Sequence, residues 1–203
     1  MKLELSIETS SRLATVAARS GGVVLQAELS STRAHASDLL PALDRLVREL
    51  GREPREVDAV YVGLGPGSYT GLRVGIATAL GLSRSTGAAL AGVCSFEVLL
   101  WERLAPGECG GVLLDGRSGG FYHARYRRLD TGLETLLEPA ILPAEEARER
   151  AAGDGRSFGD ADVPQARALL ELGAARLARG GAMLPAEVQP LYLRPFKTST
   201  RSR

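Results

Sequence analysis

The segment of residues 63–87, GLGPGSYTGLRVGIATALGLSRSTG, joins a short apolar run to a helix-forming pattern through a glycine-rich turn. Turns of this kind hold phosphate groups when their backbone N–H groups point at the ligand. A Walker-type loop also needs a lysine that reaches the outer phosphates. The chain has no lysine between Lys2 and Lys197. The sequence therefore excludes a Walker-type phosphate site.

A dinucleotide site is also poorly supported. Gly65, Gly67 and Gly71 are spaced G-x-G-x-x-x-G, whereas the dinucleotide fingerprint has two residues between its last glycines. No acidic residue lies between Asp58 and Glu97 to bind a ribose. These glycines need another explanation.

Metal-binding and nucleophilic residues are sparse. His35 and His123 are the only histidines, and Cys94 and Cys109 are the only cysteines. None of them has the close spacing of a zinc site, and we expect surface or hydrogen-bonded histidines. Ser68 lies in the glycine-rich turn, but no histidine follows nearby in sequence to activate it as a nucleophile.

Two acidic residues occupy similar positions near the starts of two predicted hairpins. Glu8 ends the first strand and precedes Thr9 and Ser10, and Asp115 ends the first strand of the second hairpin. A carboxylate followed by hydroxyl groups can lie beside Mg²⁺ and phosphate. The alternative is an ordinary strand end with a turn of small polar residues. The repeated arrangement indicates two related lobes that face a cleft.

The helix after the glycine-rich turn has a smooth stripe. Gly71, Gly75 and Ala79 recur every four residues, and Arg73 is the only charged residue before Arg84. Each glycine inside a helix costs about 0.5–1 kcal/mol relative to alanine, which indicates close packing. Two interpretations remain, packing within the same chain and docking of another subunit.

Hydrophobic periodicity predicts the order strand-strand-strand-helix-strand-helix-strand-helix for the first half of the chain. A second hairpin and two helices are predicted for the second half, followed by an extended segment and a loose tail. The predicted strands are residues 3–8, 13–20, 23–30, 57–63, 88–93, 111–116 and 121–129, and the helices are residues 38–50, 70–85, 95–104, 143–151 and 165–178.

The first of these helices is amphipathic. Leu39, Leu43 and Leu46 lie on one face at helical spacing. We expect Asp38 to be its N-cap, which would place Pro41 in the first turn, where a missing N–H costs little.

The composition is that of an ordinary globular protein, with 44% apolar residues, 24% charged residues and a net charge of +1. Bulk charge therefore does not indicate a nucleic-acid or membrane-binding protein. Two cysteines fit a reducing cytoplasm, and Glu4 and Glu8 exclude a signal peptide at the first ten residues. We expect a cytoplasmic protein that does not contact a membrane.

A linker at residues 105–111 divides the chain into an N-terminal lobe, 1–104, and a smaller C-terminal lobe, 105–203. The tail carries only basic charge, from Arg194, Lys197, Arg201 and Arg203. It is interpreted as a solvated tail, with a salt-dependent RNA contact as the alternative.

Four segments resemble the TsaB (YeaZ) family: LSIETSS, GPGSYTGLRVGIATALGL, LDGRSGGFYHARY and PLYLR, in that order. The resemblance implies an α/β, two-lobed, actin-like fold of the ribonuclease-H type (ASKHA), with mixed sheets flanked by helices. It also implies a non-catalytic dimerisation subunit that works with a TsaD-type catalytic subunit in N6-threonylcarbamoylation of the adenosine next to the anticodon in tRNA. The remaining alternative is an actin-like-fold ATPase or a glycoprotease-like metallopeptidase.

The resemblance also implies the partners and the site. A TsaD-type subunit and a TsaE-type ATPase would join this chain, tRNA would bind through the complex, and the chain alone would form a homodimer. ATP or ADP and metal would bind to the partners, leaving this chain with no cofactor, no metal and no catalytic residue of its own. The helix pair of the first lobe would dock the partner through Leu39, Leu43, Leu46, Gly71, Arg73, Gly75 and Ala79.

Nucleotide-binding members of this fold usually have Asp at the end of the first strand and Gly two residues later. This chain has Glu8 and Ser10 at these positions. The cleft is therefore expected to be vestigial. Its candidate residues are Glu8, Thr9, Ser10, Gly65, Gly67, Ser68 and Asp115.

Overall fold

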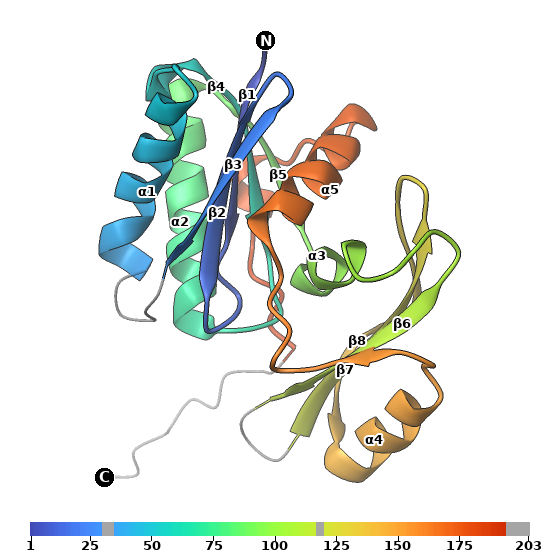
Figure 1. The fold of residues 1–203 in the computed structure, drawn as a ribbon. Coiled ribbons are helices and arrows are strands. Elements are labelled where there is room, and N and C mark those ends of the chain that lie inside the picture. Colours follow the sequence, from blue (N-terminus) through green and yellow to red (C-terminus); the bar gives the residue numbers. More distant parts are fainter. Residues whose placement is uncertain (30–34, 117–119, 194–203) are drawn as a thin grey trace, which may run out of the picture.

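The computed structural model describes residues 1–29, 35–116 and 120–193, which form two lobes, each built on its own sheet (Figure 1). The first sheet has the order β3-β2-β1-β4-β5. Its strands are β1 (Leu3–Glu8), β2 (Ala14–Ser20), β3 (Val23–Leu29), β4 (Val57–Gly63) and β5 (Ala89–Val93). The first three are antiparallel neighbours, whereas β4 and β5 run parallel to β1. The predicted mixed sheet is confirmed.

Helices cover both faces of this sheet: α1 (His35–Glu49) and α2 (Tyr69–Thr86) on one face, α5 (Ala166–Ala178) on the other (Figure 1). The residues of β4 alternate between these layers, as expected for a strand buried on both sides. Val60 and Val62 pack with the α1 and α2 layer, and Ala59 and Tyr61 pack with α5. The carboxyl ends of β1, β4 and β5 are thereby held side by side.

The position of α5 differs from the sequence analysis, which assigned all of residues 105–203 to the second lobe. The buried Ser6 hydroxyl donates to the carbonyl of Ala166 at 2.7 Å, and the Ala166 N–H donates to Thr15 Oγ1 at 2.9 Å. The chain returns to the first sheet because that sheet has a second apolar face that needs cover. The sheet of the second lobe ends at residue 158.

The second sheet has the order β8-β7-β6-β9. Its elements are β6 (Cys109–Asp115), β7 (Gly120–Leu129), β8 (Gly132–Pro143) and β9 (Ser157–Phe158), with α3 (Ser95–Trp101) and α4 (Ala144–Ala152) packed beside it. The predicted hairpin corresponds to β6 and β7. The long strand β8 was not predicted, although Gly132 closes a tight turn with a φ of 159°.

The start of α1 was predicted wrongly. The helix begins at His35, so Asp38 lies inside its first turn rather than at the N-cap, and Pro41 lies inside the helix. An acidic residue in the first turn still favours the helix through its dipole.

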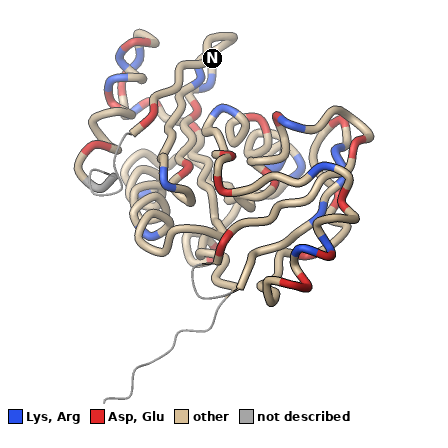
Figure 2. The backbone as a smooth tube through the Cα atoms, turned by 60° about the horizontal axis from the view of Figure 1, so that its bottom comes forward, with Lys and Arg blue, Asp and Glu red and all other residues tan. Residues whose placement is uncertain are grey.

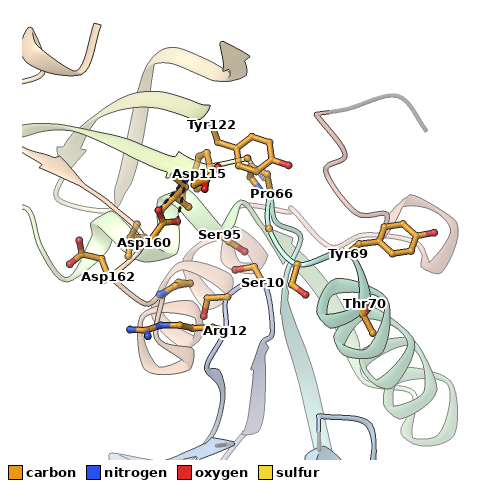
Figure 3. A pocket seen from close by; sticks show the side chains of 18 residues that line it. Ser10, Arg12, Pro66, Tyr69, Thr70, Ser95, Asp115, Tyr122, Asp160 and Asp162 are labelled. Carbon is orange, nitrogen blue, oxygen red and sulfur yellow. Dashed lines mark hydrogen bonds between the residues drawn. The ribbon is translucent and has the colours of Figure 1, made fainter. Parts of the chain in front are cut away.

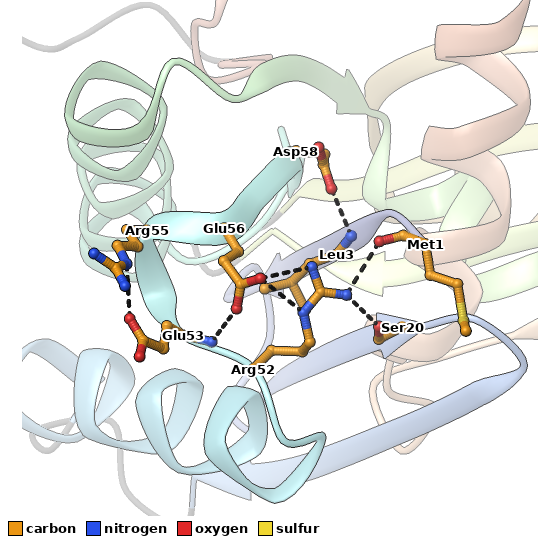
Figure 4. A network of polar contacts seen from close by, with 8 residues as sticks. All are labelled: Met1, Leu3, Ser20, Arg52, Glu53, Arg55, Glu56 and Asp58. Atoms are coloured by element: carbon orange, nitrogen blue, oxygen red, sulfur yellow. Dashed lines mark hydrogen bonds and ion pairs between the residues drawn. The ribbon is translucent and has the colours of Figure 1, made fainter.

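Polar contacts hold the start of β1 in place (Figure 4). Arg52 donates to the carbonyl of Met1 and to the Ser20 hydroxyl, both at 3.1 Å, and pairs with Glu56 at 3.0 Å. The backbone N–H of Leu3 donates to Asp58 Oδ2 at 2.7 Å. These contacts fix one end of the strand whose other end carries Glu8.

Positive and negative residues are mixed along the described chain rather than separated onto different elements (Figure 2). α2 is an exception, because Arg73 and Arg84 are its only charged residues. None of the helices in the described part of the chain has the length and apolar content that a bilayer span requires.

Candidate functional site

A cleft of about 910 Å³ lies where the two lobes meet (Figure 3). Ser10, Ser68 and Ser95 line it from the first lobe, and Asp115 and Tyr122 line it from the second. The lobes therefore enclose a cavity, as the repeated hairpin arrangement predicted. Of the other candidate residues, Gly67 lines the cleft, whereas Glu8, Thr9 and Gly65 lie behind its wall.

Glu8 is completely buried and is used inside the chain. One carboxylate oxygen accepts the backbone N–H of Ser10 at 2.8 Å, and the other accepts the Ser95 hydroxyl at 2.8 Å. Ser95 Oγ in turn accepts the N–H of Gly65 at 3.1 Å. Gly63 leaves room for the carboxylate, because a Cβ there would lie 2.1 Å from Glu8 Oε2. Through these hydrogen bonds, Glu8 connects the end of β1, the start of α3 and the glycine-rich turn instead of facing a ligand.

Burial raises the pKa of Glu8 above its ordinary value, although hydrogen bonds from Ser10, Ser95 and Thr9 oppose the shift. Desolvation disfavours the charged form, and no cation is among the partners of this carboxylate in the described residues. The arrangement stabilises the junction of β1 with α3 rather than activating an acid.

The glycines of the turn allow two backbones to approach each other. A Cβ on Gly67 would lie 2.2 Å from the carbonyl oxygen of Ser10, and one on Gly71 would lie 2.1 Å from that of Thr9. The backbone N–H of Ser68 donates to the Ser10 carbonyl at 2.6 Å. Only glycine leaves enough space for this contact between the turn and the end of β1.

Several backbone donors beside the cleft are already bonded within the chain. The N–H groups of Ser10, Gly65, Ser68 and Gly71 bond to Glu8, Ser95 Oγ, the Ser10 carbonyl and Ser68 Oγ, respectively. A phosphate site needs backbone N–H groups that point at the ligand. These four N–H groups are therefore already used within the chain and do not point at a ligand.

The charged residues of the cleft do not favour an anion either. Asp160 lines the wall beside Asp115, and its carboxylate accepts the N–H of Asp115 at 3.3 Å. Asp162 also lines the wall and pairs with Arg103 at 3.1 Å. Arg12 faces the cleft from the first lobe (Figure 3). Sequence reasoning missed Arg12 and both later aspartates, because only the fold brings residues 12 and 160 together.

The predicted docking residues lie mostly inside the chain, which corrects their assignment to an outer surface. Leu39, Leu43, Leu46 and Ala79 are buried in the first core. Gly71 and Gly75 are also buried, and a Cβ on Gly75 would lie 2.3 Å from Thr9 Oγ1. The stripe faces β1 because its small residues let the helix approach the sheet closely. Of the predicted set, Arg73 alone is exposed.

The opposite face of the helix pair is exposed, and small residues lie on its α2 part. Leu40 of α1 exposes 51% of its surface, and Arg73, Ala77 and Gly81 of α2 are exposed at four-residue spacing. A Cβ on Gly81 would have no neighbour within 4 Å. Packing within the chain therefore explains why positions 71 and 75 need glycine, but it does not explain why Gly81 is a glycine.

The described histidine side chain is a structural one. His123 Nε2 and Asp154 Oδ2 lie 2.9 Å apart, and both side chains are 1% exposed. Gly111 leaves space for this pair, since a Cβ there would lie 1.8 Å from Asp154 Oδ2. The prediction of a hydrogen-bonded histidine is confirmed for His123.

Within the described ranges, no three His, Cys, Asp or Glu residues lie close enough together to hold a metal ion. The basic residues of the tail, from Arg194 onward, lie outside the described residues, as does the side chain of His35.

Comparison with known proteins gives a consistent set of relatives. Residues 5–166 match the family model "TsaD: tRNA N6-adenosine threonylcarbamoyltransferase". The tRNA threonylcarbamoyladenosine biosynthesis protein TsaB of Escherichia coli is 26% identical, over 94% of each chain. The tRNA N6-adenosine threonylcarbamoyltransferase of Solidesulfovibrio magneticus is 44% identical over 65% of this chain and 35% of its own.

The solved structure of YeaZ from Pseudomonas aeruginosa superposes with a TM-score of 0.83. It is 25% identical and covers 95% of this chain and 100% of its own. The predicted two-lobed, actin-like fold of the ribonuclease-H type is confirmed. The chain therefore belongs to the TsaD (tRNA N6-adenosine threonylcarbamoyltransferase) family, and the relatives that it matches over nearly their full length include the TsaB protein of Escherichia coli and YeaZ from Pseudomonas aeruginosa.

Proposed function

We propose that this chain is the non-catalytic partner that a TsaD-type subunit requires for N6-threonylcarbamoylation of the adenosine next to the anticodon in tRNA. The observation that carries the proposal is the full-length match to TsaB, which covers 94% of both chains. The name of that relative states a role in the biosynthesis of threonylcarbamoyladenosine in tRNA.

The cleft supports a role without chemistry of its own. Its strand-end carboxylate, Glu8, is buried and bonded to Ser10 and Ser95. The N–H groups of Gly65 and Ser68 in the turn bond within the chain, and aspartates line the opposite wall. A general acid or base has to be within reach of a substrate, and Glu8 is not.

The outer face of α1 and α2 is the proposed docking surface. We define it by Leu40, Arg73, Ala77 and Gly81, and call it the outer helix face. Exposed glycine in a helix costs about 0.5–1 kcal/mol, which a partner helix that needs close approach would offset. Leu40, at 51% exposure, supplies apolar area on α1.

The other partners follow from this assignment. A TsaE-type ATPase would join the pair, and tRNA would bind through the assembled complex. ATP or ADP and metal would bind on the partner subunits, which agrees with the use of the Gly65 and Ser68 N–H groups within this chain. Without a TsaD-type chain, the same outer helix face would pair two copies of this chain.

The proposal is tested by co-purification. The tagged chain is expressed with an untagged TsaD-type chain from the same source, and light scattering gives the mass of the eluted species. We expect one copy of each chain in a stable pair. Separate elution of the two chains at micromolar concentration would contradict the proposal.

A further inference from the structure

Two segments far apart in the sequence form an aromatic cluster at the start of α2. The rings of Tyr69 and Tyr192 lie 5.4 Å apart between centroids, with 31° between their planes. The Arg73 guanidinium lies 4.2 Å from the Tyr69 ring centroid, and its Nε donates to the Tyr192 hydroxyl at 3.3 Å. We name these three residues the Tyr69–Tyr192 cluster.

The cluster stands at the surface and is held in place from below. Tyr69 is 41% exposed, Tyr192 is 37% exposed, and the neighbouring Leu191 is 38% exposed. The backbone N–H of Leu191 donates to the carbonyl of Leu64 at 2.7 Å, which attaches the C-terminal segment to the end of β4. The exposed rings are therefore presented on a fixed backbone.

The cluster continues the outer helix face. Tyr69, Arg73, Ala77 and Gly81 follow one another at four-residue spacing along α2, and all four are exposed. Ala77 lies near the middle of the helix, and Tyr69 is its first residue. Figure 3 shows the Tyr69 side chain at the edge of the cleft, beside Thr70 and away from Asp115. A partner lying along α2 would reach the cluster at the helix end.

The composition of the cluster fits a protein partner better than RNA. Tyrosine and arginine dominate the residues that contribute most to protein–protein affinity. Tight binding to an RNA backbone needs several cations, but the cluster has only Arg73, which is already bonded to Tyr192. The apolar Leu191 beside it also favours burial against protein.

A TsaD-type chain is the partner that fits. The family model matches residues 5–166, a range that includes both α1 and α2, so a TsaD-type chain has a corresponding helix pair. Two related helix pairs can pack face to face about an approximate two-fold axis. Tyr192 lies outside the matched range. The family model therefore indicates no residue of a TsaD-type chain that corresponds to Tyr192.

We propose that the Tyr69–Tyr192 cluster anchors the end of the outer helix face against a TsaD-type partner, with Tyr192 as an additional contact from the C-terminal segment. This inference rests on the proposed function. It extends the docking surface beyond the helix pair and assigns a role to the PLYLR segment.

The test measures the affinity of full-length variants for the TsaD-type chain by isothermal titration calorimetry. Tyr192→Ala and Arg73→Ala are each expected to weaken binding roughly 10-fold or more, as interface anchors do. Leu184→Ala is the control, because Leu184 is 68% exposed and lies in the same C-terminal segment outside the cluster. It is expected to bind as the unmodified chain does. Thermal unfolding checks that each variant is folded, and in Arg73→Ala the bond from the Leu191 N–H to the Leu64 carbonyl still attaches the C-terminal segment.

The outcomes separate this inference from the proposed function. Normal binding by both cluster variants, with binding abolished by Ala77→Trp in the middle of the face, would overturn the inference and leave the function standing. Normal binding by Ala77→Trp would overturn the docking surface itself. If the cluster variants pair normally but the assembled complex loses affinity for tRNA, the cluster contacts RNA and the inference is wrong.

Discussion

At the scale of single residues, the chain uses glycine and a buried carboxylate to join the turn before α2 to the end of β1. Gly67 and Gly71 let the turn lie directly on the carbonyls of Ser10 and Thr9. Glu8 accepts hydrogen bonds from the backbone of Ser10 and from Ser95. The Glu8 carboxylate and the N–H groups of Ser10 and Ser68 are therefore used for folding.

The first prediction compares two glycines of α2. Gly71→Ala places a Cβ against the carbonyl oxygen of Thr9 and is expected to lower the free energy of unfolding by roughly 1–3 kcal/mol. Gly81→Ala has open space and is expected to raise it by about 0.5–1 kcal/mol. Urea denaturation measures both. Equal effects of the two substitutions would contradict the packing described for Gly71.

The second prediction concerns pH and Glu8. Burial raises the folded-state pKa above the ordinary value of 4.5, so the folded chain holds this proton more tightly than the unfolded chain. The resulting stabilisation is complete below about pH 4.5 and is lost as the pH rises through the folded-state pKa. Glu8→Gln stays neutral, so its stability relative to the unmodified chain should increase from pH 4.5 upward.

Chemical denaturation at several pH values between 4 and 8 checks this second prediction. Because Glu97 and Glu102 also have raised pKa values, through burial, the comparison uses the difference between Glu8→Gln and the unmodified chain. Two stability curves that run parallel over this range would show that Glu8 does not contribute as described.

The sequence identified the stripe of Gly71, Gly75 and Ala79 but not the direction it faces. Both sides of α2 consist of small and apolar residues, and Ala77 and Gly81 form a similar row on the opposite side. Periodicity alone cannot distinguish a side that packs on a sheet from one that awaits a partner. Distinguishing them requires the position of β1.

At the scale of elements, α1 and α2 form a layer whose inner face is fully used by the first sheet. α2 carries few charges, only Arg73 and Arg84, whereas α1 exposes Arg45, Arg48 and Glu49 (Figure 2). Exposed helix faces of soluble proteins are usually charged or polar. The small outer face of α2 therefore favours a partner, as proposed.

The third prediction tests this face directly. Ala77→Trp adds a large ring to an exposed position in the middle of α2 and is expected to weaken pairing with a TsaD-type chain at least 10-fold, because small residues are needed for close helix contact. Ala152→Trp, the same change at an exposed position of α4, is the matched control and should pair normally. Surface plasmon resonance measures both.

Two results would count against the outer helix face. Equal affinities for the two tryptophan variants would show that the partner docks elsewhere. Loss of binding by Ala152→Trp alone would place the interface on the second lobe, near α4.

The elements of the first lobe were predictable because each strand and helix has a clear periodicity. Two features were not. β8 contains Leu136 and Leu137 in succession and Pro139, which obscure the alternation of a strand. α1 begins at His35, before the expected cap at Asp38, because the apolar face alone does not mark the first turn.

At the scale of the whole molecule, the chain crosses between lobes twice. It leaves the first sheet after β5, builds the second sheet, and returns with α5 to cover the open face of the first. The glycine and proline content of the sequence predicts a boundary between the lobes near residue 105. It does not predict that α5 returns to pack on the first sheet. Its contacts with Ser6 and Thr15 join residues about 150 positions apart in sequence.

The cleft between the lobes illustrates the same limit. Sequence reasoning proposed Ser10, Gly67, Ser68 and Asp115, and these residues do line it. It could not supply Asp160, which a loop after β9 brings to the wall. Nor could it show that the N–H groups of Gly65 and Ser68 are already bonded.

The fourth prediction, at this scale, is a reconstituted modification reaction with unmodified tRNA, a TsaD-type chain, a TsaE-type ATPase and a supplied threonylcarbamoyl donor. Mass spectrometry of tRNA nucleosides measures threonylcarbamoyladenosine. We predict that product forms only when this chain is added, and that Ala77→Trp restores less than a tenth of it while Glu8→Gln restores it fully. Full product formation without this chain, or loss of product with Glu8→Gln, would contradict a role as non-catalytic partner.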